Sequence, residues 1–158
     1  MNDMENKAYV FSRIFMLANR LQALGDRMDA TITVKQWLLI AIILRSGGSP
    51  TLGEIAERSG NSRQNTKKMA VILQKQGFLE LKPDLQDRRI LRVAVTDRCQ
   101  DYFRSREDRE LQFMEQLFSG IDPEMLDAVR EGISRLMANV AIMEQADLKE
   151  KPDEEETE

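Results

Sequence analysis

Histidine is absent from this 158-residue chain, and cysteine occurs only once, as Cys99. A single cysteine cannot form an intrachain disulfide, and without histidine no Cys/His zinc site can assemble within one chain. The missing histidine also removes the commonest general base and a haem ligand. Because the chain has neither a paired nucleophile nor a glycine-rich phosphate motif, an enzyme is the least favoured class of function, and we expect no cofactor and no metal.

Long apolar runs are also missing from the sequence. The longest, from Trp37 to Leu44, has eight residues, well short of the ~18 that a membrane helix needs. Asp3, Glu5 and Lys7 interrupt any early apolar stretch, so no signal-peptide pattern opens the chain. We therefore expect a cytoplasmic protein without a membrane partner.

The net charge of −4 argues at first against DNA as a partner, but the charges are segregated along the chain. Residues 51–98 carry ten Lys or Arg against six Asp or Glu, whereas residues 144–158 carry two Lys against eight Asp or Glu. Binding responds to the local field of a face, so the basic segment remains a candidate for DNA. The acidic segment is poor in apolar residues, and we expect a disordered tail over residues 146–158.

Both ends of the chain show apolar residues at helical spacing. Residues 5–25 predict a long helix with Gly25 as its stop. Thr96 is expected to cap a helix that continues to Ser119-Gly120, and Asp122-Pro123 starts the last helix. The apolar faces of these terminal helices indicate a helical dimer interface made from both ends of the chain.

The middle of the chain predicts short helices joined by a tight turn. Thr33–Gln36 and Thr51–Glu54 are capping-box patterns, each of which starts a helix. Residues 59–61 form the turn, and Asn61 or Ser62 caps the helix that follows to Gln76. Gly77 is a natural left-handed stop for that helix.

A hairpin is expected directly after these helices. Residues 79–82 and 91–95 alternate between apolar and polar side chains, as half-buried strands do, around a charged loop. Helix, turn, helix and hairpin in this order are typical of a winged helix–turn–helix, which places one exposed helix in the DNA major groove. We expect a mainly α fold with a small β-hairpin wing, plus a helical dimerisation region from both termini.

The second helix of the pair separates its side chains by face. The spacing i, i+3, i+4, i+7 places four of them toward the core: Thr66, Met69, Ala70 and Leu73. The other face carries amide and ammonium groups that can pair with adenine or guanine edges, while the first turn suits base edges and phosphate. A lysine pair alone would indicate only a solvated face, but this helix position favours DNA. The predicted DNA-binding residues are Ser62, Arg63, Gln64, Asn65, Lys67 and Lys68.

The loop of the hairpin offers a second candidate site. Arg88 and Arg89 lie beside Asp84 and Asp87 in the sequence. The four side chains form either a local salt-bridge lattice that shapes the loop or a basic tip that projects into the minor groove. Both can hold together if the aspartates fix the loop and the arginines project. We predict Asp87, Arg88 and Arg89 as the DNA-binding residues of the wing.

Over about residues 5–145, the ordered set of motifs resembles the MarR family (multiple-antibiotic-resistance regulators). The wing Asp-Arg-Arg, followed by a strand and a Thr cap, is its most specific part. The residues that carry the resemblance are Thr33 with Gln36-Trp37, Leu52-Gly-Glu-Ile-Ala56, Ser62-Arg63-Gln64, Gly77-Phe78-Leu79, Asp84, Asp87-Arg88-Arg89 and Val95-Thr96.

The resemblance implies a homodimer with a roughly palindromic operator on double-stranded DNA. It implies recognition helices that read two half-sites, a wing arginine in the minor groove, and repression relieved by a small phenolic or anionic ligand. Family positions match Ser62, Arg63, Gln64, Lys67 and Lys68 in the recognition helix and Asp87, Arg88 and Arg89 in the wing. Residues 1–145 then form one protomer: residues 5–32 and 97–145 are the dimerisation region, and residues 33–96 are the DNA-binding region.

Two features depart from the family pattern. Cys99 stands where glycine is frequent, and the N-terminal cysteine of the redox-sensing members is absent, so Cys99 is interpreted as a small structural residue. The acidic tail is also outside the pattern. The alternative function is a winged-helix module for protein interaction or DNA architecture, which would bind DNA without sequence preference.

Overall fold

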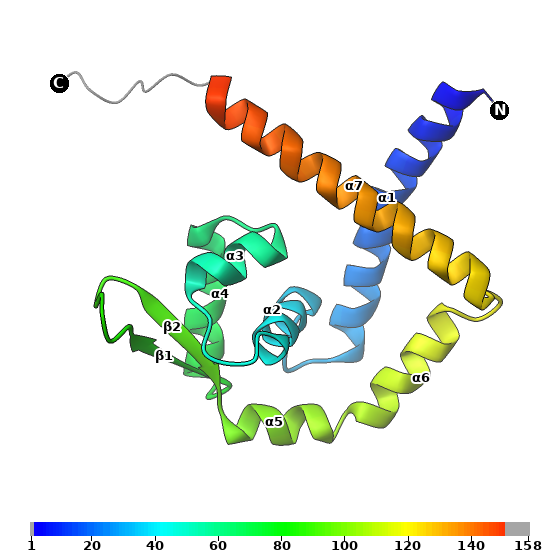
Figure 1. The fold of residues 1–158 in the computed structure, drawn as a ribbon. Coiled ribbons are helices and arrows are strands. Elements are labelled where there is room, and N and C mark those ends of the chain that lie inside the picture. Colours follow the sequence, from blue (N-terminus) through cyan, green and yellow to red (C-terminus); the bar gives the residue numbers. More distant parts are fainter. Residues whose placement is uncertain (1, 151–158) are drawn as a thin grey trace. The chain divides into compact units, whose positions relative to one another are not determined.

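The computed structural model describes residues 2–150, which form seven helices and one antiparallel two-stranded sheet (Figure 1). This confirms the predicted mainly α fold with a hairpin wing. The described chain divides after Arg106 into two compact units, and none of its helices is long and apolar enough to cross a membrane. The elements are α1 (Asp3–Met28), α2 (Val34–Arg45), α3 (Leu52–Ser59), α4 (Arg63–Lys75), β1 (Leu79–Pro83), β2 (Leu91–Val95), α5 (Asp97–Arg104), α6 (Glu107–Leu117) and α7 (Pro123–Glu150).

The core of the first unit is built around α2. This helix packs against α3, α4 and β2, and all of these elements contribute fully buried apolar side chains. The helix–turn–helix and the hairpin therefore share one core. Burying one such side chain stabilises the fold by roughly 1.5–3 kcal/mol. The largest buried side chains include Leu39, Ile40 and Ile43 of α2, Ile55 of α3, Leu73 of α4, Phe78, Leu79 of β1 and Val93 of β2.

The helix starts follow the predicted caps. The Thr33 N–H donates to Gln36 Oε1 at 2.9 Å, and the Thr51 N–H donates to Glu54 Oε2 at 2.7 Å, each as half of a complete capping box. Ser62, rather than Asn61, caps α4 by accepting a hydrogen bond from the Asn65 N–H. Gly77 has φ +79°, which confirms the left-handed stop after α4.

The prediction that Gly25 ends the first helix is wrong, because α1 continues to Met28. Gly25 has a packing role instead. A Cβ built at this position would lie 2.2 Å from Val34 Cγ2, much closer than two carbon atoms can approach. Glycine therefore lets the start of α2 pack tightly against α1.

The single helix predicted after Thr96 is also wrong. α5 ends at Arg104 and α6 begins at Glu107, so two residues interrupt it. The Ser105 hydroxyl donates back to the Tyr102 carbonyl at 2.7 Å, and the Arg106 N–H donates to the Phe103 carbonyl at 3.1 Å. These bonds close the last turn of α5, and the Arg106 side chain reaches Asp29.

The last helix begins as predicted and ends later. The Met125 N–H donates to Asp122 Oδ1 at 2.8 Å, as expected for an N-cap before Pro123. α7 extends to Glu150, so residues 146–150 are helical and the predicted tail does not start at 146. Four of the five residues from 146 to 150, namely Ala, Leu, Lys and Glu, favour helix, which accounts for the extension. The remainder of the predicted tail, 151–158, lies outside the described residues.

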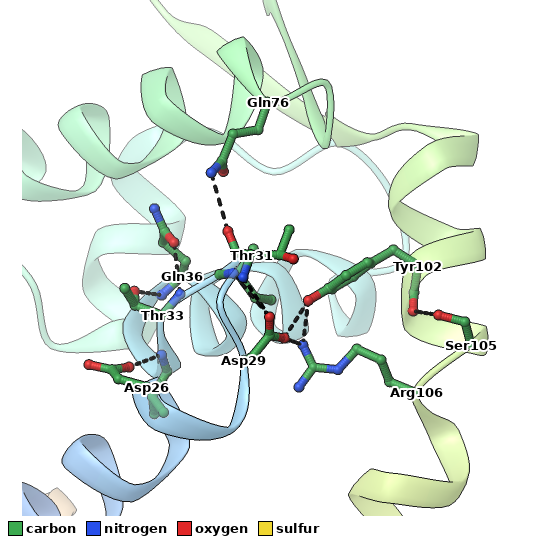
Figure 2. Close-up of polar contacts among 11 residues, drawn as sticks. Asp26, Asp29, Thr31, Thr33, Gln36, Gln76, Tyr102, Ser105 and Arg106 are labelled. Carbon is green, nitrogen blue, oxygen red and sulfur yellow. Dashed lines mark hydrogen bonds and ion pairs between the residues drawn. The ribbon is translucent and has the colours of Figure 1, made fainter.

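Asp29, at the end of α1, connects parts of the first unit that are far apart in sequence (Figure 2). Its carboxylate accepts hydrogen bonds from the Thr31 N–H, the Tyr102 hydroxyl and the Arg106 guanidinium. Burial raises the pKa of Asp29, but the hydrogen bonds from Tyr102 and Thr31 and the charge of Arg106 outweigh it, so the pKa is lowered. The cluster thus favours the ionised carboxylate in the folded state.

The close approach at Gly25 predicts an unusual response to alanine. Glycine to alanine within a helix normally stabilises a protein by roughly 0.5–1 kcal/mol. For Gly25→Ala we expect a loss of about 1–3 kcal/mol in the free energy of unfolding, measured by urea denaturation, because the new methyl group overlaps Val34. Gly53→Ala in α3 is the matched control, since the nearest atom to its added Cβ lies at an ordinary 3.8 Å.

A double-mutant cycle assigns this loss to the overlap with Val34. The cost of Gly25→Ala should shrink in a Val34→Ala background, because the clashing methyl group is gone. Strict additivity of the two substitutions would contradict the packing role assigned to Gly25.

The lowered pKa of Asp29 predicts an acid-dependent contribution to stability. A depressed carboxylate pKa stabilises the fold above the ordinary value of 3.8, and this contribution is lost as the pH falls through the lower folded-state pKa. Relative to wild type, Asp29→Asn should be less stable at pH 7, and the difference should narrow below about pH 4. Urea unfolding between pH 3 and 7 measures both. A difference that does not change with pH would rule out the charged role of Asp29.

Candidate nucleic-acid interface

The two faces of α4 differ as the sequence predicts. Thr66, Met69, Ala70 and Leu73 are buried against the core. The other face exposes polar and cationic side chains, with Val71 half-buried among them. The predicted site residues that α4 and its cap expose to solvent are Ser62, Arg63, Gln64, Asn65, Lys67 and Lys68.

The first turn of α4 is held in place by its own polar groups. Ser62 Oγ accepts the Asn65 N–H at 3.2 Å, and the Asn65 side-chain amide donates to Asn61 Oδ1 at 3.4 Å. Gly60, with φ +64°, supplies the left-handed turn between α3 and this cap. Ser62 and Asn65 therefore have a structural role in orienting the exposed end of α4.

Asp84 organises the loop of the wing. Its Oδ1 accepts the Gln86 and Asp87 N–H groups at 2.8 and 3.1 Å, and its Oδ2 pairs with Arg92 of β2. The hydrogen bond from Arg92, followed by those from the Asp87 and Gln86 N–H groups, lowers the pKa of Asp84 to about 2. This carboxylate is ionised at neutral pH and keeps the loop closed.

Asp87 completes the loop and leaves the arginines extended. Its Oδ1 accepts the Arg89 N–H at 3.0 Å, and its carbonyl accepts the Ile90 N–H at 2.9 Å. The Arg89 side chain is 95% exposed, and its Nε lies 3.7 Å from Asp87 Oδ1, so this exposed ion pair contributes little. Arg88 is exposed and forms no ion pair with any residue between 2 and 150. The aspartates shape the loop while the arginines point into solvent.

Arg92 is the residue of the wing that sequence reasoning missed. Its Nη1 donates to the Ser49 carbonyl at 3.0 Å, and the adjacent Val93 N–H donates to the Pro50 carbonyl at 2.9 Å. The hairpin is thereby tied to the segment that leads into α3. In sequence, Arg92 is only one polar position of an alternating strand; its pairing with Asp84 follows from the hairpin register, in which Lys82 faces Arg92 and Pro83 faces Leu91.

Between residues 2 and 150, Cys99 does not form a reactive thiol site and the acidic side chains do not form a metal site. Cys99 is fully buried, and burial raises the pKa of its thiol to about 11, so the reactive thiolate is scarce at neutral pH. Within residues 2–150, no group of three or more His, Cys, Asp or Glu side chains could hold a metal ion. The site is thus a polar helix face beside a projecting basic loop, an arrangement that can bind a polyanion with a groove.

Known proteins match both the sequence and the fold. A MarR family model matches residues 30–90. The uncharacterized HTH-type transcriptional regulator YfiV of Bacillus subtilis is 29% identical over 132 residues, covering 84% of this chain and 82% of its own.

Two solved structures illustrate the shared fold. A MarR/EmrR family transcriptional regulator from Acinetobacter sp. ADP1 superposes with a TM-score of 0.74 at 18% identity, covering 85% of this chain and 96% of its own. FabT of Streptococcus pneumoniae, solved in complex with DNA, has a TM-score of 0.67 at 16% identity and covers 89% and 99%. The chain is therefore similar to the MarR family in sequence over residues 30–90, and it shares the winged helix–turn–helix fold of the solved MarR family regulators.

Proposed function

We propose that the protein is a homodimeric repressor that binds a roughly palindromic operator and is released by a small phenolic or anionic ligand. The observation that carries this proposal is the division of α4 into one buried and one polar face beside a wing with extended arginines. The complex of the structural relative FabT with DNA supports DNA as the partner. Repression and ligand release are proposed from the resemblance to the MarR family.

In this proposal, α4 lies in the major groove and reads bases through its first two turns. Arg63, Gln64, Asn65, Lys67 and Lys68 supply donors and acceptors for base edges or phosphates. The Ser62 hydroxyl accepts one hydrogen bond and, within the described chain, donates none, so its hydrogen is available to a phosphate oxygen. The helix N-terminus adds a favourable dipole for that phosphate.

The wing contacts the neighbouring minor groove through Arg88 and Arg89. Asp87 contributes by accepting the Arg89 N–H, which fixes the conformation of the loop. A compact, aspartate-braced loop loses little conformational entropy on binding, which favours a specific contact. The ties from Arg92 and Val93 to residues 49–50 fix the wing relative to the helix–turn–helix. Both DNA-contacting elements then approach the duplex as one rigid surface.

Exposed apolar faces on the terminal helices support the dimer. In the described residues, neither α1 nor α6 contains a buried residue. Monomeric proteins rarely expose apolar surface on this scale, and a second copy of the chain is the simplest cover. The exposed apolar side chains include Val10, Phe11, Ile14, Phe15 and Leu17 of α1, and Met125, Val129, Ile133, Leu136, Val140 and Met143 of α7.

The wing is tested by Arg88→Ala combined with Arg89→Ala. A dimer that makes about eight phosphate contacts should show log K against log salt with a slope near −7. The double variant should bind DNA more weakly and flatten the slope by roughly 2 or more, because each wing loses cationic contacts. Fluorescence anisotropy with a labelled duplex at several salt concentrations measures both, and sedimentation confirms that the dimer is intact.

Arg130→Ala combined with Arg135→Ala in α7 is the charge-matched control, since both side chains are about three-quarters exposed and form surface ion pairs. It removes the same charge and should leave the slope nearly unchanged. Wild-type binding by the Arg88/Arg89 variant would remove the wing from the proposed interface.

Base reading is tested by Gln64→Ala. This variant should lose roughly 1–3 kcal/mol of binding free energy on the duplex that wild type enriches from a random pool, and little on random DNA. The reason is that Gln64 contributes a bidentate contact to one base, whereas phosphate contacts are unchanged. Gln74→Ala, an exposed glutamine near the other end of α4, is the control. Equal losses on both duplexes would show that Gln64 does not read sequence.

A further inference from the structure

The C-terminal end of α4 is held by contacts from outside the helix–turn–helix. The Gln76 side-chain amide donates to the Thr31 carbonyl in the α1–α2 turn at 3.3 Å. The Thr96 hydroxyl donates to the Gly77 carbonyl at 2.7 Å, and the Thr96 N–H donates to the Phe78 carbonyl at 3.1 Å. The end of the proposed recognition helix is therefore fastened both to the α1–α2 turn and to the start of α5.

Asp29 fixes the turn that Gln76 contacts. Its Oδ1 accepts the Thr31 N–H at 2.7 Å and the Ile32 N–H at 3.4 Å, while its Oδ2 accepts hydrogen bonds from Tyr102 and Arg106 (Figure 2). The side chains of Asp29 and Arg106 are only 10% and 17% exposed. Removing one partner of a largely buried ion pair leaves the other charge without compensation and destabilises the fold. The cluster therefore constrains the turn strongly.

Tyr102 of α5 reaches the end of α4 by two routes. Through its hydroxyl it joins Asp29, and thus Thr31 and Gln76. Through its ring it packs against the fully buried Phe78, with centroids 5.0 Å apart. Arg106 holds Tyr102 in place, since its Nη1 donates to the Tyr102 hydroxyl at 2.8 Å and its guanidinium lies 5.2 Å from the ring centroid.

We propose that Asp29, Tyr102 and Arg106 are positioning residues for DNA binding, which set the orientation of α4 without touching the duplex. This inference rests on the proposed function. Arg106 is the last residue of the first unit, and the chain continues from it into α6. The cluster therefore links the start of the proposed dimerisation helices to the recognition helix, through Thr31 and Gln76 on one side and Phe78 on the other.

The test uses Tyr102→Phe in the full-length chain, because it keeps the ring on Phe78 and removes only the hydroxyl. Two readouts are combined. Hydrogen exchange of the Gly77 and Phe78 amides, which donate to the Gln74 and Leu73 carbonyls at 2.9 Å, should become faster. Affinity for the wild-type-enriched duplex should fall about fivefold or more, as for a typical coupling between sites. Affinity for random DNA should change less.

Two further variants separate positioning from general stability. Gln76→Met keeps the side-chain length but loses the amide that donates to Thr31, so it should reproduce both effects if Tyr102→Phe folds poorly. Asp122→Ala removes the N-cap of α7 and lowers stability away from α4. At concentrations where sedimentation shows that its dimer is intact, it should leave exchange at Gly77 and Phe78 and DNA affinity as in wild type.

The outcomes distinguish this inference from the proposed function. Faster exchange together with weaker cognate binding in Tyr102→Phe or Gln76→Met, but not in Asp122→Ala, supports the positioning role. With wild type selecting a sequence, unchanged affinity in both cluster variants overturns that role, and so does lost affinity without faster exchange. If wild type selects no sequence, the proposed function itself fails, and the positioning role for DNA binding fails with it.

Discussion

The inner face of α4 is the surface on which the rest of the first unit depends. Thr66, Met69, Ala70 and Leu73 must be buried for α2, α3 and the hairpin to share one core. Residues three and four positions apart lie on one side of a helix. When that side is buried, the opposite side of α4 faces solvent. The sequence supplies amides and ammonium groups there, so packing that stabilises the fold also presents a polar stripe to a partner.

The wing depends on the same core through its backbone. β2 donates to the Pro50 carbonyl, and Arg92 donates to the Ser49 carbonyl, so the hairpin is anchored beside the start of α3. Asp84 fixes the conformation of the loop by accepting hydrogen bonds from two backbone N–H groups and by pairing with the anchored Arg92. The aspartates accept the backbone N–H groups of the loop. Arg88 and Arg89 therefore remain exposed, and the weak pair between Arg89 and Asp87 does not hold Arg89 in place.

Sequence patterns were reliable where the determining contacts are local. The capping boxes, the Gly77 stop and the two faces of α4 depend on residues within one or two turns of each other. Three features depend on contacts that local sequence patterns do not report, and they were missed. They are Val34 filling the space beside Gly25, Arg106 contacting Asp29 at the break between α5 and α6, and Arg92 of β2 pairing with Asp84 of the hairpin loop. Periodicity cannot report such contacts, because the polar partners lie in different elements or across a turn.

Selection of bound fragments from a random duplex pool at near-physiological salt is the most direct test of the central claim that the α4 face and the wing read DNA as a dimer. Sequencing should show an enriched inverted repeat whose half-sites lie about one helical turn apart, because two symmetry-related recognition helices enter successive major grooves. Retention of DNA without any enriched sequence would contradict the claim and indicate architectural, sequence-independent binding, and a complete lack of retention would contradict the DNA role of both elements.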